Sequence, residues 1–270
     1  MRLTASQLGL QYEEVIVATD LSIEIPDGQV SALIGPNGSG KSTLLRALSR
    51  LLKPKAGTVI LDGKTIDSYS TKEVARRLAI LPQVLITPES ISVQELVAYG
   101  RHPQRKSIGG MQEEDRRAID WALEVTATKE LRDRPVDHLS GGQRQRVWIA
   151  LVLAQGTDLI LLDEPTTFLD IAYQLEVLEL LKHLNEAEGK TIVMVLHDIN
   201  MACEYSQMLF ALRDGTLIAQ GDPREVLTAG LIRNVFGIDA HIVEHPSSGA
   251  PMCVPIPVPH AVRDADFVPA

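Results

Sequence analysis

The chain has 270 residues, with 26 lysines and arginines against 35 aspartates and glutamates, which gives a formal net charge of −9. This acidic balance argues against general nucleic-acid binding, which depends on basic surface, and a composition of 45% hydrophobic and 23% charged residues excludes a disordered chain. The two cysteines, Cys203 and Cys253, are too few for a disulfide scaffold and favour a reducing compartment.

The first third of the sequence predicts the opening of an α/β unit. Residues 1–10 lack the long apolar run that is typical of a signal peptide. Alternating apolar residues over 21–25 predict a strand before a turn at 26–28, and 30–34 is typical of a buried strand. A glycine-rich loop then leads into a helix that begins at Lys41, and a second hairpin is expected around 58–63.

The middle of the sequence predicts an inserted helical subdomain. Residues 93–134 are charged and mainly helical in pattern, with a weak linker at 101–110. Ile119, Ala122 and Leu123 recur at helical spacing, which predicts a helix over 113–125.

The α/β pattern returns in the last third. Residues 159–162 predict a strand, Asp170 is placed to cap a helix over 171–184, and 191–196 predict another strand. Asp222 and Pro223 are typical of a helix start, whereas proline, serine and glycine from His245 onward predict an irregular, surface-lying tail. No apolar run approaches the roughly 20 residues that a membrane-spanning helix needs.

These patterns divide the chain into four parts. They are the first part of an α/β core with a β subdomain (1–92), the helical subdomain (93–155), the rest of the core (156–244) and a C-terminal tail (245–270).

The glycine-rich loop matches the pattern of a phosphate-binding loop. Glycines let backbone N–H groups turn toward phosphate oxygens, and the following helix adds its positive N-terminal end. We expect Lys41 to contact the β- and γ-phosphates of a nucleotide and Ser42 to offer its hydroxyl to Mg²⁺. The predicted nucleotide-binding residues here are Gly35, Pro36, Asn37, Gly38, Ser39, Gly40, Lys41, Ser42 and Thr43.

Two acids end the predicted strand at 159–162. A phosphate-loop enzyme needs a carboxylate at such a strand end to hold Mg²⁺, directly or through water, and Asp163 suits that role. Glu164 would point toward the γ-phosphate, where it could orient and deprotonate a water molecule.

A further motif comprises Ser140, Gly141, Gly142 and Gln143 before a helical pattern over 144–155. By spacing alone it could simply be a capped helix start. Together with the phosphate loop and the two acids, however, it resembles the ATP-binding cassette (ABC) transporter ATPases over almost the whole chain. The resemblance implies an α/β fold: an ABC-type P-loop ATPase domain with a RecA-like core, an antiparallel β subdomain and an inserted α-helical subdomain.

Other residues match motifs of that family in the family's order. Gln83 matches the glutamine that links Mg²⁺ to the helical subdomain, Asp170 the aspartate of the dimer-contacting loop, and His197 the switch histidine. Tyr12 lies 29 residues before Lys41, where the family stacks an aromatic ring on adenine. The resemblance thus implies catalytic roles for Lys41, Gln83, Glu164 and His197, and Mg²⁺ binding by Ser42, Gln83 and Asp163.

The resemblance also implies a mechanism and partners. Two copies would pack head to tail, so that each ATP lies between the phosphate loop of one chain and Ser140–Gly142 of the other. A permease dimer in the membrane would dock in a groove near Gln83, and an extracytoplasmic binding protein would deliver cargo without touching this chain. The chain would work at the cytoplasmic face of the cell membrane, with no nucleic-acid partner.

Several stretches resemble the importer branch for ferric siderophores, haem and vitamin B12: 99–103, 166–171, 221–227 and the segment from Phe236 onward. One departure is Thr167–Asp170, where the wider family favours Ser-Ala-Leu-Asp. We expect a ferric siderophore importer ATPase. The alternatives are a haem or cobalamin importer ATPase, a soluble ABC ATPase outside transport, and a nucleotide-binding scaffold without turnover, which the intact Glu164 and His197 argue against.

Overall fold

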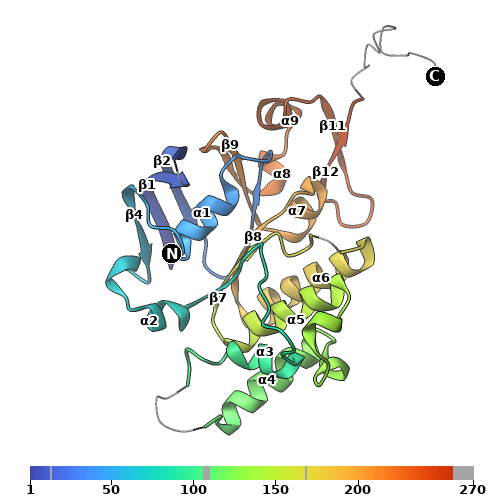
Figure 1. Cartoon of the computed structure of the whole chain (residues 1–270). Helices are drawn as coiled ribbons and strands as arrows, with labels where there is room; N and C mark the ends of the chain where they lie inside the picture. The colour runs from blue at the N-terminus through green and yellow to red at the C-terminus, as the bar shows by residue number, and fades with distance from the viewer. Residues whose placement is uncertain (13, 106–109, 168, 258–270) are drawn as a thin grey trace, which may run out of the picture.

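The computed structural model describes residues 1–12, 14–105, 110–167 and 169–257. A six-stranded sheet runs through the molecule (Figure 1). Across the sheet, its strands are β10 (Thr216–Gly221), β9 (Met208–Arg213), β3 (Val30–Ile34), β8 (Thr191–Val195), β7 (Leu159–Asp163) and β6 (Leu78–Leu81). All neighbours pair in parallel except β9 and β10. Strands β3, β7 and β8 are buried along their whole length, which explains their unbroken apolar sequences.

A second, antiparallel sheet covers one face of the central sheet. Its strands, in order, are β2 (Val15–Ile25), β1 (Leu3–Tyr12), β4 (Ala56–Leu61) and β5 (Lys64–Thr65). Alternate side chains of β3 enter two separate cores: Leu33 packs with the antiparallel sheet and α1, whereas Ala32 and Ile34 pack with the helices on the other face. The strand predicted over 21–25 is the end of the longer β2.

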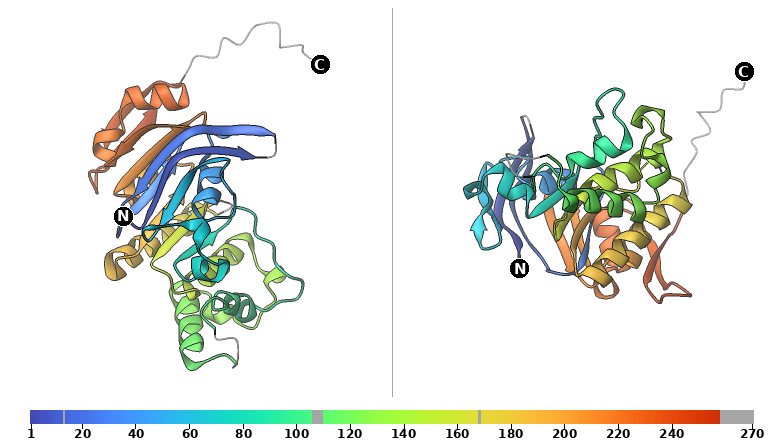
Figure 2. Two further views of the ribbon diagram at one scale, coloured as in Figure 1. Left: turned by 90° about the vertical axis from the view of Figure 1, so that its left-hand side faces the viewer. Right: turned by 90° about the horizontal axis from the view of Figure 1, so that it is seen from below.

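Helices pack on the other face of the central sheet, and three of them form a group of their own at one end of the molecule. Helices α3, α4 and α5 pack on one another at the bottom of Figure 1 and of the left view of Figure 2. Among the described residues, the helices are α1 (Lys41–Leu48), α2 (Thr71–Ala75), α3 (Val93–Tyr99), α4 (Glu113–Val125), α5 (Gly141–Ala154), α6 (Ile171–Glu188), α7 (Ile199–Tyr205), α8 (Pro223–Val226) and α9 (Ala229–Phe236), with short 3₁₀ turns at Ile66–Ser68, Lys129–Leu131 and Val136–His138. No helix in these described ranges is both long and apolar enough to cross a membrane.

The α/β fold expected from the sequence, with its antiparallel β sheet and its group of helices, is confirmed, but the expectation of an irregular tail is wrong for part of that tail. Strand β12 (Pro251–Pro255) pairs with β11 (Ala240–Glu244) and packs on α7. The Asn200 side chain accepts a hydrogen bond from Cys253 N at 2.7 Å and donates one to Cys253 O at 3.2 Å. The sequence did not predict this short strand because a proline lies at each end of it, and proline is normally a turn or strand-edge signal. The predicted division of the chain at 92, 155 and 244 stays a prediction.

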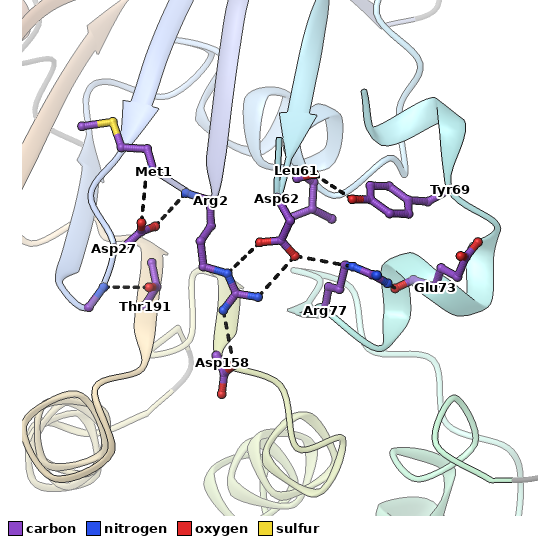
Figure 3. A network of polar contacts seen from close by, with 11 residues as sticks. Met1, Arg2, Asp27, Leu61, Asp62, Tyr69, Glu73, Arg77, Asp158 and Thr191 are labelled. Carbon is purple, nitrogen blue, oxygen red and sulfur yellow. Dashed lines mark hydrogen bonds and ion pairs between the residues drawn. The ribbon is translucent and has the colours of Figure 1, made fainter. Parts of the chain in front are cut away.

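A polar network joins the antiparallel sheet to the start of β7 (Figure 3). Arg2 Nε lies 2.8 Å from Asp62 Oδ1, and its Nη1 lies 3.3 Å from Asp158 Oδ2. Arg77 Nε approaches the other oxygen of Asp62 at 3.5 Å. The amino group of Met1 pairs with the carboxylate of Asp27 at 3.2 Å. These contacts hold the first strand at a fixed place against the core.

Candidate nucleotide site

The glycine-rich loop leaves the centre of the sheet at the end of β3 and enters α1. Gly35, Gly38 and Gly40 have φ values of 150°, 80° and 97°, in the region that favours glycine. A Cβ atom on Gly35 would lie 2.1 Å from the carbonyl oxygen of Leu212, so the loop can take this path only with glycine there. Gly40 occupies the N-cap of α1 and has no side chain to accept from the first-turn N–H groups, which suits an anion at this helix end.

Lys41 is held inside the loop, with 5% of its surface exposed. Its Nζ donates to Gly35 O at 2.8 Å and to Pro36 O at 2.9 Å. Burial lowers the pKa of Lys41, and the nearby carboxylates of Glu164 and Asp163 act in the opposite direction. Because its ammonium group is bonded to the loop itself, Lys41 lies within reach of a phosphate bound in that loop.

Ser42 and Asp163 bring two oxygen atoms together beside the loop. Ser42 Oγ donates to Asp163 Oδ1 at 2.8 Å, across from α1 to the end of β7. Asp163 is 3% exposed, and its burial raises the pKa of its carboxyl group. A hydroxyl and a carboxylate are the oxygen ligands that Mg²⁺ prefers, so this donor set fits the ion predicted from the sequence.

Glu164 follows Asp163 and faces His197, which comes after β8. Glu164 Oε1 lies 2.7 Å from His197 Nε2, and Glu164 Oε2 accepts from Thr167 Oγ1 at 3.0 Å. Burial alone would raise the pKa of Glu164, but hydrogen bonds from His197, Thr167 and Gln83 outweigh it and lower the pKa below its ordinary value. The backbone of Glu164 has a φ of 54°, which is uncommon outside glycine and typical of strained functional positions.

Lys41, Ser42, Glu164 and His197 share one pocket of about 680 Å³, and Asp163 is bonded to Ser42 in its wall. Its lining residues are Tyr12, Val15, Val17, Asn37, Gly38, Gly40, Lys41, Ser42, Thr43, Gln83, Glu164 and His197. The structure thus brings together most of the site residues predicted from distant motifs. Gly35, Pro36 and Ser39 lie behind this wall and shape the loop, with Ser39 N donating to Pro36 O at 3.2 Å.

Sequence reasoning missed several residues around the pocket. Val15 and Val17 form a wall beside Tyr12, and Arg46 lies 5.7 Å from the Tyr12 ring centroid. Thr167 holds the Glu164 carboxylate. The alternation of β2 could have assigned the two valines to one face of the strand, but nothing in the sequence places that face at a pocket.

Comparison with known proteins identifies the family. The sequence model of the ABC transporter family matches residues 18–167, more than half of the chain. The chain belongs to the ABC transporter family. It is 51% identical over 252 residues to the iron(3+)-hydroxamate import ATP-binding protein FhuC of Bacillus subtilis (strain 168), covering 93% of this chain and 94% of that protein. It is 52% identical over 255 residues to the ferric enterobactin transport ATP-binding protein FepC of Escherichia coli (strain K12), covering 94% of each.

A solved ABC structure supports the same assignment. The dimeric post-hydrolysis state of the ATP-binding cassette MJ0796, bound to ADP and Pi, superposes with a TM-score of 0.73 at 30% identity. The match covers 82% of this chain and 98% of that one. These similarities show that the chain is an ABC cassette and that it is similar in sequence to the ATP-binding proteins of ferric siderophore importers.

Two predicted motifs of this ABC chain lie away from its pocket. Ser140 caps α5, where Gln143 N donates to Ser140 Oγ at 3.3 Å, and Asp170 caps α6, where Tyr173 N donates to Asp170 Oδ1 at 3.1 Å. Gly141 and Gly142 form the first turn of α5, which begins before the helix predicted over 144–155 because Ser140 supplies the cap. None of Ser140–Gln143 or Asp170 is among the residues that line the pocket. Phe168, between the two motifs, lies outside the described residues.

Proposed function

We propose that this chain is the ATP-hydrolysing subunit that powers an importer for ferric siderophores and works at the cytoplasmic face of the cell membrane. The observation that supports hydrolysis most directly is the contact between Glu164 Oε1 and His197 Nε2 at 2.7 Å, in the same pocket as Lys41. The cargo is proposed from the two relatives named for iron(3+)-hydroxamate and ferric enterobactin.

ATP would bind with its phosphates in the glycine-rich loop. Lys41 would exchange its hydrogen bonds with Gly35 O and Pro36 O for bonds with the β- and γ-phosphate oxygens. The Tyr12 ring is 46% exposed at the rim of the pocket, where it is free to stack on adenine. The valines beside it add apolar surface for the base.

Ser42, Gln83 and Asp163 would hold Mg²⁺. Once bound, the ion would neutralise charge on the phosphates. Asp163 is anchored for this role by its bond from Ser42, and Gln83 stands close enough to hydrogen-bond Glu164. Gln83 would thus contact both the ion and Glu164.

Glu164 would orient and polarise the attacking water. Its lowered pKa keeps the carboxylate ionised at neutral pH, but the same low pKa makes it a weak base. The carboxylate would therefore fix the water first and accept its proton as the water oxygen bonds to the γ-phosphorus and the bond from that phosphorus to the ADP oxygen breaks. His197 and Thr167 hold the two carboxylate oxygens so that they cannot rotate away.

A second copy of the chain would complete the site. Ser140–Gln143 and Asp170 lie outside the chain's own pocket, which supports the proposal that they act on the nucleotide of a partner copy. Val84 and Ile86 are 66% and 82% exposed just after Gln83. Such apolar exposure supports docking of a permease helix on this segment. An extracytoplasmic binding protein would supply cargo to that permease.

Uptake of labelled ferric siderophore by cells tests the proposal. Cells with the native chain are compared with cells that make Glu164→Gln at equal level, and phosphate release is measured on both purified proteins. We expect both activities to depend on Glu164. Uptake that is unchanged while phosphate release is lost would retain the ATPase and reject the siderophore, leaving a haem or cobalamin importer or an ABC ATPase outside transport.

A further inference from the structure

The segment that follows α3 contains a buried ion pair outside the nucleotide pocket. Arg101 is 6% exposed and Asp115, in the first turn of α4, is 4% exposed. Arg101 Nε donates to Asp115 Oδ1 at 2.9 Å. The other oxygen of Asp115 accepts from Gln112 N at 3.1 Å and so caps α4.

Burying both charges has a high desolvation cost, which a pair recovers only with good geometry and further hydrogen bonds. Apolar side chains could fill the same space without that cost. Burial alone would raise the pKa of Asp115, but the bond from Arg101 and the N–H of Gln112 lower it below its ordinary value. The pair is therefore ionised, and it ties the start of α4 to the segment that follows α3.

Arg101 also reaches the end of the helix that begins at the Ser140 motif. Its Nη1 donates to Ala154 O, in the last residue of α5, at 3.0 Å. The last carbonyls of a helix have no partner within the helix, and a cation there is favourable. Helix α5 has 14 residues and is about 21 Å long, so a tilt at Ala154 displaces Ser140 at its other end.

The same end of α5 is tied to the core. Gln155 Nε2 donates to the carbonyl oxygen of Leu78, the first residue of β6, at 2.9 Å, and also to that of Ala75, the last residue of α2. Gln104 Nε2, three residues after Arg101, donates to Gln155 O at 3.2 Å. Strand β6 leads directly to Gln83 in the nucleotide pocket. The segment after α3 thus joins the three helices of the subdomain to the strand that supplies Gln83.

We infer that Arg101 is a positioning residue for ATP hydrolysis: by fixing the C-terminal end of α5, it sets where Ser140–Gly142 meets the nucleotide of a second copy. The inference rests on the proposed function, in which this motif acts across two copies. It assigns a physical role to the stretch 99–103, which the sequence only marked as similar to one branch of the family.

The test uses full-length protein in the Glu164→Gln background, where ATP should hold two copies together without being hydrolysed. Arg101→Lys keeps the charge but loses the planar fork that bonds Asp115 and Ala154 at once. We expect ATP-dependent dimerisation, measured by analytical ultracentrifugation, to weaken by about tenfold or more, because small displacements of a distant positioning group have effects of this size. Affinity of the monomer for a fluorescent ATP analogue should change by less than about twofold.

Arg132→Lys is the matched control, because Arg132 also pairs with an acid of α4, Asp120 at 3.0 Å, but is only half-buried and, within the described residues, makes no bond to α5. It should leave dimerisation unchanged. If Arg101→Lys does not fold, dimerisation is measured on Asp115→Asn instead. Asparagine has nearly the same shape, but it removes the charge that holds the Arg101 guanidinium in place beside Ala154 O. The inference is overturned if the Glu164→Gln protein dimerises equally well with and without Arg101→Lys. It is also overturned if Arg101→Lys weakens dimerisation only as much as it weakens nucleotide binding by the monomer. Failure of Glu164→Gln alone to dimerise with ATP instead overturns the proposed function.

Discussion

Glu164 and His197 follow neighbouring parallel strands, β7 and β8, and their side chains meet at 2.7 Å over the mouth of the phosphate loop. The parallel pairing of the strands, in which Asp163 lies beside Val195, places both residues at one edge of the sheet. Glu164 also has a φ of 54°, uncommon outside glycine, directly after the strand ends. The contact therefore depends on the register of two strands that are joined by parallel pairing.

Replacing Glu164 with glutamine should abolish hydrolysis without preventing ATP binding. The amide keeps the shape of the carboxylate but cannot take a proton from water, which costs about 10²- to 10⁴-fold in rate. Phosphate release and nucleotide binding on the purified protein measure the two effects. Glu130→Gln, an exposed acid on the helical subdomain, serves as the control. Turnover within a few-fold of the native rate would remove Glu164 from the mechanism.

The Asp163→Asn substitution should weaken the use of magnesium. The asparagine side chain would keep the size of the buried aspartate but lose its negative charge. We expect the Mg²⁺ concentration for half-maximal phosphate release to rise about 10- to 100-fold, and chelation by EDTA to stop the native enzyme. An unchanged magnesium titration would show that Asp163 has only a structural bond with Ser42.

Tyr12→Ala should weaken ATP binding and Tyr12→Phe should not. Ring stacking contributes about 0.5–1.5 kcal/mol, so the alanine variant should lose roughly twofold to thirteenfold in affinity. Calorimetric titration of each variant with ATP gives the comparison. Equal affinities in all three proteins would argue that the ring merely covers Arg46.

Acid should weaken the native fold more than that of Asp115→Asn. The folded-state pKa of Asp115 is below its ordinary value of 3.8, so the ionised form stabilises the fold at any pH above that value. That contribution is lost as the pH falls from about 4 through the lowered pKa. Urea unfolding of both proteins between pH 6 and pH 3 should show their difference in stability shrinking on the acid side. A difference that is constant with pH would mean that the pair contributes packing and not charge.

Asn200→Ala should loosen the C-terminal strand. The side-chain amide satisfies both the N–H and the C=O of the buried Cys253, and an orphaned buried group costs about 1–3 kcal/mol. The free energy of unfolding should fall by about that amount in urea titrations. Asn234→Ala changes an exposed asparagine on α9 and should have little effect. Similar losses in both variants would contradict a special role for Asn200.

Local patterns predicted the phosphate loop, the strand before it and the two acids at the end of β7, because each is defined by residues close in sequence. The position of Tyr12 and the roles of Gln83 and His197 came only through the family resemblance, since a lone tyrosine, glutamine or histidine has no local signature. The structure adds the spatial relation: Gln83 and His197 reach Glu164, whereas Ser140 and Asp170 do not enter the pocket.

Long-range pairing was out of reach of sequence reasoning. Nothing near Arg101 marks it as the partner of Asp115, and both charges would ordinarily be assigned to solvent. Strand β12 was missed because its stability comes from β11 and Asn200, not from its own proline-flanked residues. In both cases the deciding contact is made by a segment that is distant in sequence.

The placement of β3 at the centre of the sheet has a consequence for synthesis on the ribosome. The strand that bears the phosphate loop pairs with β8 on one side and β9 on the other, and both are encoded more than 150 residues later. A nascent chain that has emerged only as far as α6 already contains the loop, but lacks both neighbours that hold its supporting strand. Such non-local pairing is slow and leaves strand edges exposed. Nucleotide binding should therefore arise late in translation, and fragments that end before residue 191 should be targets for chaperones rather than working ATPases.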